Sequence, residues 1–193
     1  MKIAFVIYDG MTALDFVGVY DPVTRLKTMG FVPDIDYDVC ATIREVRDAA
    51  GLRIVADRVC VPFDGYDMVI VPGGLASRTL VDDGDFIGWL RTAAPCRYKV
   101  SVCSGALLLG VAGFLRGKRA TTHHDAMRAL AAYGATAVEA RVVDDGDVIT
   151  AGGVTSAIDL GLYLVEKLAG PEVCEKIRAQ MEYEPRYTGC QHQ

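Results

Sequence analysis

The chain has 193 residues, a formal net charge of −5 and an apolar content of 51%. This length suits one sizeable core, and no stretch has the composition of a linker, so a single domain over residues 1–193 is expected. The acidic balance, with Lys and Arg scattered, excludes a nucleic-acid surface. The longest apolar run, 105–115, is far shorter than the roughly 20 residues that cross a bilayer. We therefore expect a globular cytoplasmic protein with neither a nucleic-acid nor a membrane partner.

Short apolar runs alternate with helical patterns along the chain. The predicted strands cover residues 2–8, 37–42, a small β excursion at 51–60, then 67–74, 100–102, 118–124 and a hairpin at 140–153. The predicted helices cover residues 12–30, 85–94, 105–115, 125–134, 155–170 and 171–185. This alternation predicts an α/β fold, with a mostly parallel sheet and helices on both faces.

Ligands of such sheets bind beyond the carboxyl ends of the strands. Four strand ends meet this condition and are rich in small residues: "YDGMTALD", "VPGG", "VCSG" and "TAGGVTS". Gly153, in the last of them, is a candidate for substrate binding. None of these turns carries a G-x-G-x-x-G or P-loop pattern, so no nucleotide cofactor is expected.

The cysteines and histidines give no metal signature. Six cysteines occur without a C-x-x-C pair, and we expect free thiols; they are Cys40, Cys60, Cys96, Cys103, Cys174 and Cys190. His123 and His124 are adjacent, so on a regular element their side chains would point to different sides. With no other ligand at suitable spacing, no metal site is expected.

Cys103 is the strongest candidate for a reactive residue. In "SVCSG" it lies between a strand and a helix, flanked by Ser101, Ser104 and Gly105, as in a nucleophile elbow. The N-terminus of the following helix would lower the pKa of the thiol. The spacing fits a core cysteine at a tight turn equally well.

Two further features could assist such a cysteine. Backbone N–H groups of Gly73 and Gly74, with that of Ser104, could bind developing negative charge, although a tight turn alone also requires glycine. Asp15 could act as a general acid and base. Thr12 and Asp15 also match a T-x-x-D capping box, and the residues alone favour that interpretation.

Taken together, these segments resemble the DJ-1/PfpI superfamily, and they do so in its order along nearly the whole chain. The resemblance implies a flavodoxin-like three-layer sandwich with an elbow cysteine, and it favours an acidic role for Asp15 beside that cysteine. It also implies a homodimer. Within the superfamily the chain is most similar to the isonitrile hydratases, through the "LD" segment, the cysteine followed by a hydroxyl residue, "TTH" and "GGVTS".

This similarity implies a definite chemistry, in which Cys103 attacks the isocyanide carbon and Asp15 first protonates that carbon and then activates water. Hydrolysis of the thioimidate releases an N-substituted formamide, without any cofactor. The similarity also implies that Ser104 is catalytic beside Cys103 and Asp15, although Ser104 stands where a threonine is usual. Val19 stands where a proline is common, and the segment "EYEPRYTGCQHQ" matches only in part.

Other functions within the superfamily are weighed against this one. Peptidases of the PfpI type place histidine directly after the cysteine, where this chain has Ser104, so peptidase activity would require His123 to approach Cys103. A glyoxalase or deglycase of the DJ-1 type uses a glutamate, one methylene longer than Asp15. A redox or ligand sensor without turnover, based on oxidation of Cys103, is a further alternative.

Overall fold

The computed structural model describes residues 1–184, and a seven-stranded sheet forms its centre. The strand order is β10-β11-β7-β6-β1-β2-β5, and every neighbouring pair is parallel except β10 with β11. The strands are β1 (Lys2–Val6), β2 (Asp36–Ala41), β5 (Arg58–Val59), β6 (Met68–Val71), β7 (Tyr98–Val102), β10 (Val142–Asp144) and β11 (Val148–Ala151).

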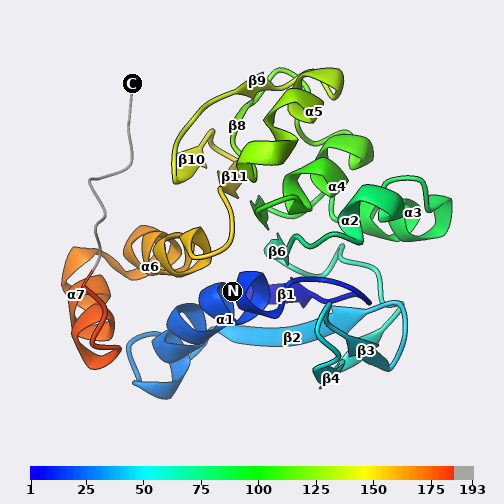
Figure 1. Ribbon diagram of the computed structural model, residues 1–193. Helices are drawn as coiled ribbons and strands as arrows, with labels where there is room; N and C mark the ends of the chain where they lie inside the picture. Colours follow the sequence, from blue (N-terminus) through cyan, green and yellow to red (C-terminus); the bar gives the residue numbers. More distant parts are fainter. Residues whose placement is uncertain (185–193) are drawn as a thin grey trace.

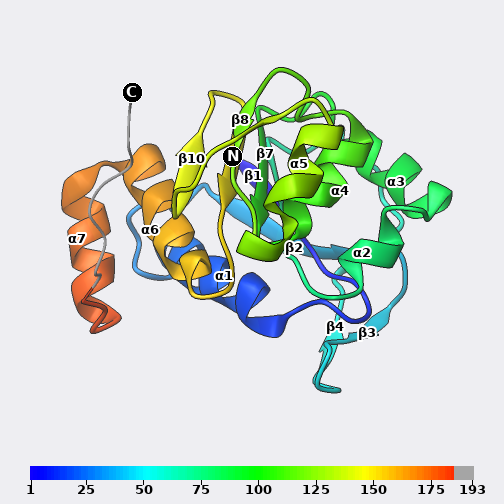
Figure 2. The same cartoon turned by 45° about the horizontal axis from the view of Figure 1, so that its top comes forward.

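Helices cover both faces of this sheet (Figures 1 and 2). One group consists of α1 (Ala13–Thr28), α6 (Ser156–Ala169) and α7 (Pro171–Gln180), with α6 in contact with both others. The other group consists of α2 (Ser77–Leu80), α3 (Gly84–Arg91), α4 (Gly105–Ala112) and α5 (Met127–Ala132), which meet around α4. This arrangement confirms the predicted flavodoxin-like α/β sandwich. None of the described helices is both long and apolar enough to span a membrane.

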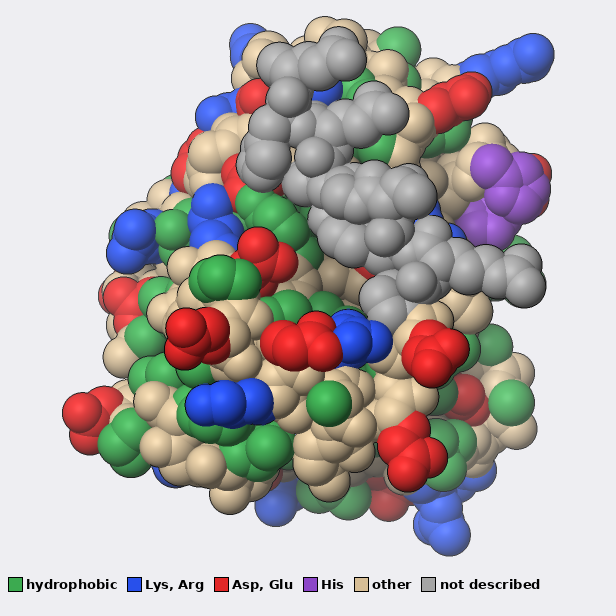
Figure 3. Space-filling view, turned by 90° about the vertical axis from the view of Figure 1, so that its left-hand side faces the viewer, with side chains coloured by type: hydrophobic (Ala, Val, Ile, Leu, Met, Phe, Trp, Pro, Cys, Tyr) green, Lys and Arg blue, Asp and Glu red, His purple; other side chains and the backbone are tan. Residues whose placement is uncertain are grey.

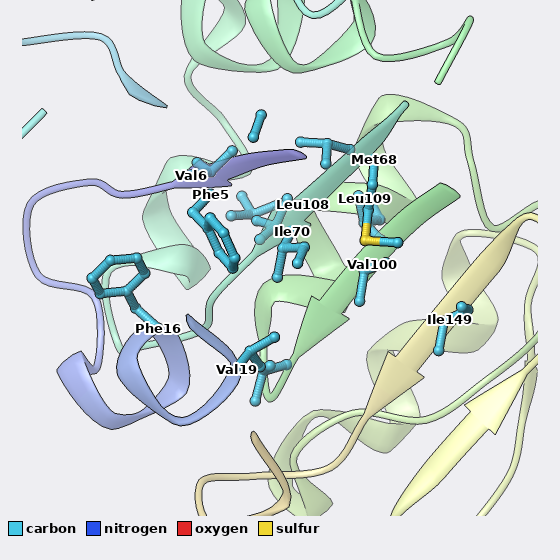
Figure 4. Close-up of a cluster of buried hydrophobic side chains, with 14 of the residues drawn as sticks. Phe5, Val6, Phe16, Val19, Met68, Ile70, Val100, Leu108, Leu109 and Ile149 are labelled. Carbon is cyan, nitrogen blue, oxygen red and sulfur yellow. The ribbon is translucent and has the colours of Figure 1, made fainter. Parts of the chain in front are cut away.

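The core lies between the sheet and its two helical layers (Figure 4). Strands β1 and β6 are almost continuously apolar because both of their faces are buried, and β7 is buried at every position although it includes Lys99 and Ser101. Phe5 of β1 meets Phe16 of α1 edge to face, with ring centroids 6.2 Å apart. On the other side, α4 contributes the fully buried Leu108 and Leu109. Helix α4 has no polar face because nearly all of its residues are buried.

Close packing of α1 against α6 fixes the position of α1. A Cβ on Gly18 would lie 2.7 Å from Cβ of Ala157, and one on Gly161 would lie 2.3 Å from Cγ of Pro22. Both glycines are therefore required for the two helices to approach. Pro22 lies inside α1, which continues to Thr28, and its ring packs in the space that Gly161 leaves.

The structure differs from the sequence-based expectation mainly in short elements. β3 (Glu45–Arg47) pairs with β4 (Arg53–Val55) in a separate hairpin, and the strand expected at 118–124 is reduced to β8 (Arg119–Ala120), which pairs with β9 (Thr136–Ala137). A 3-10 helix, η1 (His124–Ala126), precedes α5, and α2 was not predicted. The hairpin expected at 140–153 is confirmed by the antiparallel pairing of β10 with β11, and Gly146 in its turn has a φ of +85°. Cys190 and most of the segment "EYEPRYTGCQHQ" lie outside the described residues.

Candidate active site

Cys103 occupies a strained turn between β7 and α4. Its φ of +55° lies in the left-handed region, which costs a residue other than glycine about 1–3 kcal/mol. The turn is tight because α4 begins against the end of β6: a Cβ on Gly105 would lie 2.4 Å from the carbonyl oxygen of Val71. The backbone therefore has the shape of the nucleophile elbow that "SVCSG" suggested.

Hydrogen bonds from two other segments hold this turn in place. The backbone N–H of Cys103 donates to the carbonyls of Ala151 (2.9 Å) and Gly152 (3.1 Å) at the end of β11. The hydroxyl of Thr122 donates to the carbonyl of Cys103 at 2.6 Å. Thr122 belongs to the "TTH" segment, but its residue type and spacing gave no sign of this contact. These bonds offset part of the backbone strain and fix where the thiol points.

Asp15, near the N-terminus of α1, is completely buried and faces the elbow. Its Oδ2 accepts a hydrogen bond from the backbone N–H of Gly73 at 3.0 Å. The side chain of Thr12 makes no capping hydrogen bond, so the capping box that the residues alone favoured does not form. The carboxyl group turns inward to Gly73 instead of back to the helix terminus.

The carboxyl of Asp15 and the thiol of Cys103 shift each other's pKa. Burial raises the pKa of Asp15 to about 7, although hydrogen bonds from Gly73 and from the thiol oppose this rise. Burial, and then the nearby charge of Asp15, raise the pKa of Cys103 to about 12. The expected lowering of the thiol pKa by the helix terminus is therefore wrong, because desolvation outweighs the stabilisation from the N–H of Ser104. The resting pair holds a neutral thiol.

One oxygen of Asp15 remains available to this thiol. Oδ1 is buried and accepts no hydrogen bond from the described residues. The thiol of Cys103 nevertheless lies close enough to lower the pKa of the carboxyl group. A buried polar atom without a partner is costly, and such atoms often belong to functional sites. Asp15 is therefore held through Oδ2, and its carboxyl group lies close enough to the thiol of Cys103 for the two groups to affect each other's pKa.

The amides expected to bind developing charge are already engaged within the protein. The N–H of Gly73 binds Asp15, and the N–H of Gly74 donates to Oγ of Ser104 at 3.1 Å. Ser77, at the start of α2, connects Gly74 with Ser104, because its hydroxyl lies within hydrogen-bond distance of the carbonyl of Gly74 and of Oγ of Ser104. In this structure Gly73 and Gly74 thus position Asp15 and Ser104. Ser77 was missed because a four-residue helix leaves no periodic pattern.

Gly153 separates the thiol from a histidine. A Cβ on Gly153 would lie 3.2 Å from Sγ of Cys103 and 2.4 Å from Cδ2 of His123. The structure thus brings Gly153 to the thiol, as the sequence predicted, and it brings His123 close as well. Nδ1 of His123 accepts a hydrogen bond from the backbone N–H of Asp125 at 3.3 Å, so His123 is the N-cap of η1.

The two adjacent histidines do not point to different sides. Because residues 121–124 leave β8 and enter η1, the segment is not a regular strand, and the rings of His123 and His124 lie side by side, with centroids 4.2 Å apart and planes tilted by 35°. An open cleft begins beside them. Its lining comes from Thr121, Thr122, His124, Met127, Arg128, Glu139, Ala140, Arg141, Gly152, Gly153 and Ser156.

Tyr8 completes the inner wall of the site and was also missed. It follows β1, is buried, and donates its hydroxyl to the carbonyl of Pro72 at 2.9 Å. Burial raises its pKa well above the ordinary value, and the charges of Asp15 and Cys103 add to the rise. Tyr8 therefore stays neutral beside the pair. Its position in "VIYDG" carried no signal beyond the end of a strand.

Comparisons with known proteins agree on one family. The sequence profile of the DJ-1/PfpI family matches residues 1–167. An isonitrile hydratase of Pseudomonas putida is 35% identical over 187 residues, which cover 96% of this chain and 79% of that protein. A ThiJ/PfpI family protein of Pseudomonas syringae superposes with a TM-score of 0.85 at 32% identity, covering 100% of this chain and 78% of that one. DJ-1 of Toxoplasma gondii, in oxidized form, shares the fold with a TM-score of 0.79 at 24% identity, covering 95% and 99%.

Proposed function

The chain belongs to the DJ-1/PfpI family, and we propose that it is an isonitrile hydratase, a lyase that adds water to an isocyanide and releases the N-substituted formamide. The observation that carries this proposal is the arrangement of Asp15, with Oδ2 fixed by Gly73 and Oδ1 left buried beside the thiol of Cys103. The likeness to the Pseudomonas putida hydratase supports it. Cys103 and Asp15 are the proposed catalytic residues, and Ser104 a positioning residue.

The first half of the reaction adds the thiol across the terminal carbon of R–N≡C. The carboxylate of Asp15 accepts the proton of the Cys103 thiol while the sulfur forms a bond to the carbon. Asp15 then delivers that proton to the same carbon, which gives the thioimidate R–N=CH–S. Because the proton is consumed at the carbon, the raised pKa of the thiol is compatible with this step. A carboxyl with a pKa of about 7 can both accept and return a proton near neutrality.

The second half releases the product. Water adds to the thioimidate carbon, and Asp15 transfers one of its protons to the nitrogen, giving R–NH–CH(OH)–S. The carbon–sulfur bond then breaks, the remaining hydroxyl proton returns to the sulfur through Asp15, and R–NH–CHO leaves. The sum is one isocyanide plus one water to one formamide, with Cys103 and Asp15 restored.

The burial of the thiol supports a slender substrate. Only 6% of the Cys103 side chain is exposed, between Gly153 on one side and the turn of Gly73 on the other. The reactive end of an isocyanide is linear and carries no substituent, so it can reach a sulfur that a branched carbonyl compound reaches less easily. The open cleft beyond Gly153 would then receive the group R.

The experiment is an assay of formamide formation from a panel of alkyl and aryl isocyanides. We expect turnover by the wild type and none by Cys103→Ala or Asp15→Asn. Cys60→Ala is the matched control, because Cys60 is an exposed free cysteine elsewhere in the chain. Absence of formamide with every isocyanide would reject the hydratase, and methylglyoxal consumption would then test the glyoxalase alternative.

We also propose a cytoplasmic homodimer. Apolar side chains are exposed around the site: Leu75, which follows Gly74, is 78% exposed, and Leu14 and Val17 flank Asp15 on α1. Such a group of side chains suits a surface covered by a second copy of the chain. Light scattering should give twice the monomer mass, and Leu75→Glu should shift the protein toward the monomer; a monomeric wild type would reject the dimer.

A further inference from the structure

Three consecutive side chains outside the Cys103–Asp15 pair bring metal-binding atoms together. One ligand atom from each of His123, His124 and Asp125 lies within 4.8 Å of the others. Nε2 of His124 is 3.0 Å from Oδ1 of Asp125, and Nδ1 of His123 is 3.7 Å from Oδ2 of the same residue. Figure 3 shows the histidine side chains at the molecular surface, with acidic atoms beside them.

These separations suit coordination of one ion. Ligands that are about 2.0–2.1 Å from a tetrahedral Zn²⁺ lie roughly 3.4 Å from one another. The two separations of 3.0 and 3.7 Å end on different oxygens of Asp125, and one ligand atom from each of the three residues lies within 4.8 Å of the others. Rotations of the three side chains would bring these atoms to the spacing that one ion requires.

The backbone holds this group in place before any ion binds. His123 is the N-cap of η1, and its carbonyl accepts a hydrogen bond from the N–H of Ala126 at 2.8 Å. The preceding residue, Thr122, is tied to the carbonyl of Cys103. The stacked rings limit the freedom of both histidines. Less ordering is therefore needed on binding than for ligands on a flexible loop.

The charge of the group also favours a cation. Within residues 1–184, the carboxylate of Asp125 has ion-pair contacts with the two imidazoles alone, and no Lys or Arg lies within ion-pair distance of it. His124 and Asp125 are largely exposed, so water can fill the remaining coordination positions. Two imidazoles and one carboxylate are donors that select Zn²⁺ and similar ions over Mg²⁺.

We propose that His123, His124 and Asp125 form a binding site for a divalent transition metal of the zinc class, open to solvent at the mouth of the cleft. An ion at Nδ1 of His123 replaces the long hydrogen bond from the N–H of Asp125. His124 lines the cleft and His123 lies against Gly153, so the bound ion sits next to the path that leads to Cys103. This proposal does not depend on the nature of the reaction at Cys103.

The test is a titration of the full chain with Co²⁺, followed by visible absorption, and with Zn²⁺ in competition. We expect one ion per chain, a spectrum without thiolate charge-transfer bands, and displacement by Zn²⁺ but not by Mg²⁺. His124→Ala and Asp125→Asn should each weaken binding by at least the roughly 10- to 100-fold that a lost outer-shell partner costs. Both positions are exposed, so these variants are expected to fold.

Matched controls separate this site from other ligands. Asp82→Asn removes an equal charge from an exposed position, and Cys60→Ser removes the exposed thiol; both should bind Co²⁺ as the wild type does. The proposal is overturned if no ion binds, if thiolate bands appear, if Cys60→Ser abolishes binding, or if His124→Ala and Asp125→Asn bind normally.

Discussion

Replacing Asp15 with Asn tests the burial of this carboxyl through protein stability. In the unfolded chain the carboxyl titrates near 3.8, whereas burial raises the pKa of Asp15 to about 7 in the folded protein. The folded state therefore binds the proton more tightly, and the wild type loses stability as the pH rises from about 4 through 7. A pKa shift of about 3 units corresponds to roughly 4 kcal/mol of unfolding free energy, and this contribution is fully lost above pH 7.

Asparagine carries no charge, so Asp15→Asn escapes this loss. Its amide oxygen can still accept the hydrogen bond from Gly73, but its NH₂ group takes the place of Oδ1, which has no partner. An unpaired buried amide costs about 1–3 kcal/mol at any pH. We therefore expect Asp15→Asn to be less stable than the wild type near pH 4 and more stable by about 1–3 kcal/mol near pH 8.

The measurement is urea-induced unfolding of both proteins at several values between about pH 4 and pH 8, under one ionic strength. The unfolding free energy of the variant minus that of the wild type should rise by roughly 4 kcal/mol over this range. Asp82→Asn, at an exposed position, should show almost no such rise. A difference for Asp15→Asn that does not change with pH would refute the raised pKa, and a constant loss would favour a helix-capping role.

Three further results are expected. In a pH profile of formamide formation, kcat/KM should fall about tenfold per unit below pH 7, because protonated Asp15 cannot accept the thiol proton; a flat profile would contradict this. Cys103→Gly should have a free energy of unfolding about 1–2 kcal/mol higher than that of Cys103→Ala in urea denaturation, because glycine tolerates the φ of +55°; equal free energies would show that the turn relaxes. Gly153→Ala should lower kcat/KM by about 100-fold, since its Cβ would meet His123 and the thiol, and adding His123→Ala should restore part of the loss; no effect of Gly153→Ala would mean that the backbone shifts freely.

The larger elements of the fold could be predicted because their buried faces require apolar residues at regular positions along the sequence. The apolar runs at 2–6 and 68–71 are strands buried on both faces, and the valines at 100 and 102 mark a third such strand. By contrast, β3 and α2 have three and four residues, too few for a period of 2 or 3.6 to be visible. The strand predicted over 121–124 was wrong for another reason. β-branched threonines are typical of strands, but here the hydroxyls of Thr121 and Thr122 donate hydrogen bonds to the carbonyls of Ala140 and Cys103.

At the site, the positions of the reactive residues could be predicted but not their electrostatics. Cys103 and Asp15 stand at two strand ends that a parallel sheet must bring together, and the resemblance to the superfamily decided between a base and a helix cap for Asp15. The pKa values depend on how deeply both groups are buried, which neighbouring residues do not reveal. A helix N-terminus alone suggested a thiolate, whereas the site holds a thiol.

The neutral thiol makes the elbow inert at rest. With the pKa of Cys103 at about 12, roughly one molecule in 10⁵ carries the thiolate at pH 7. Peroxide and alkylating reagents consume thiolates, so they should find Cys103 a poor target and the exposed Cys60 a better one. In the proposed reaction, the sulfur becomes a nucleophile only when a reagent at the site can take up its proton through Asp15. Selectivity toward such reagents, with protection from accidental oxidation, would thus follow from the burial of the thiol and from its position beside the charge of Asp15.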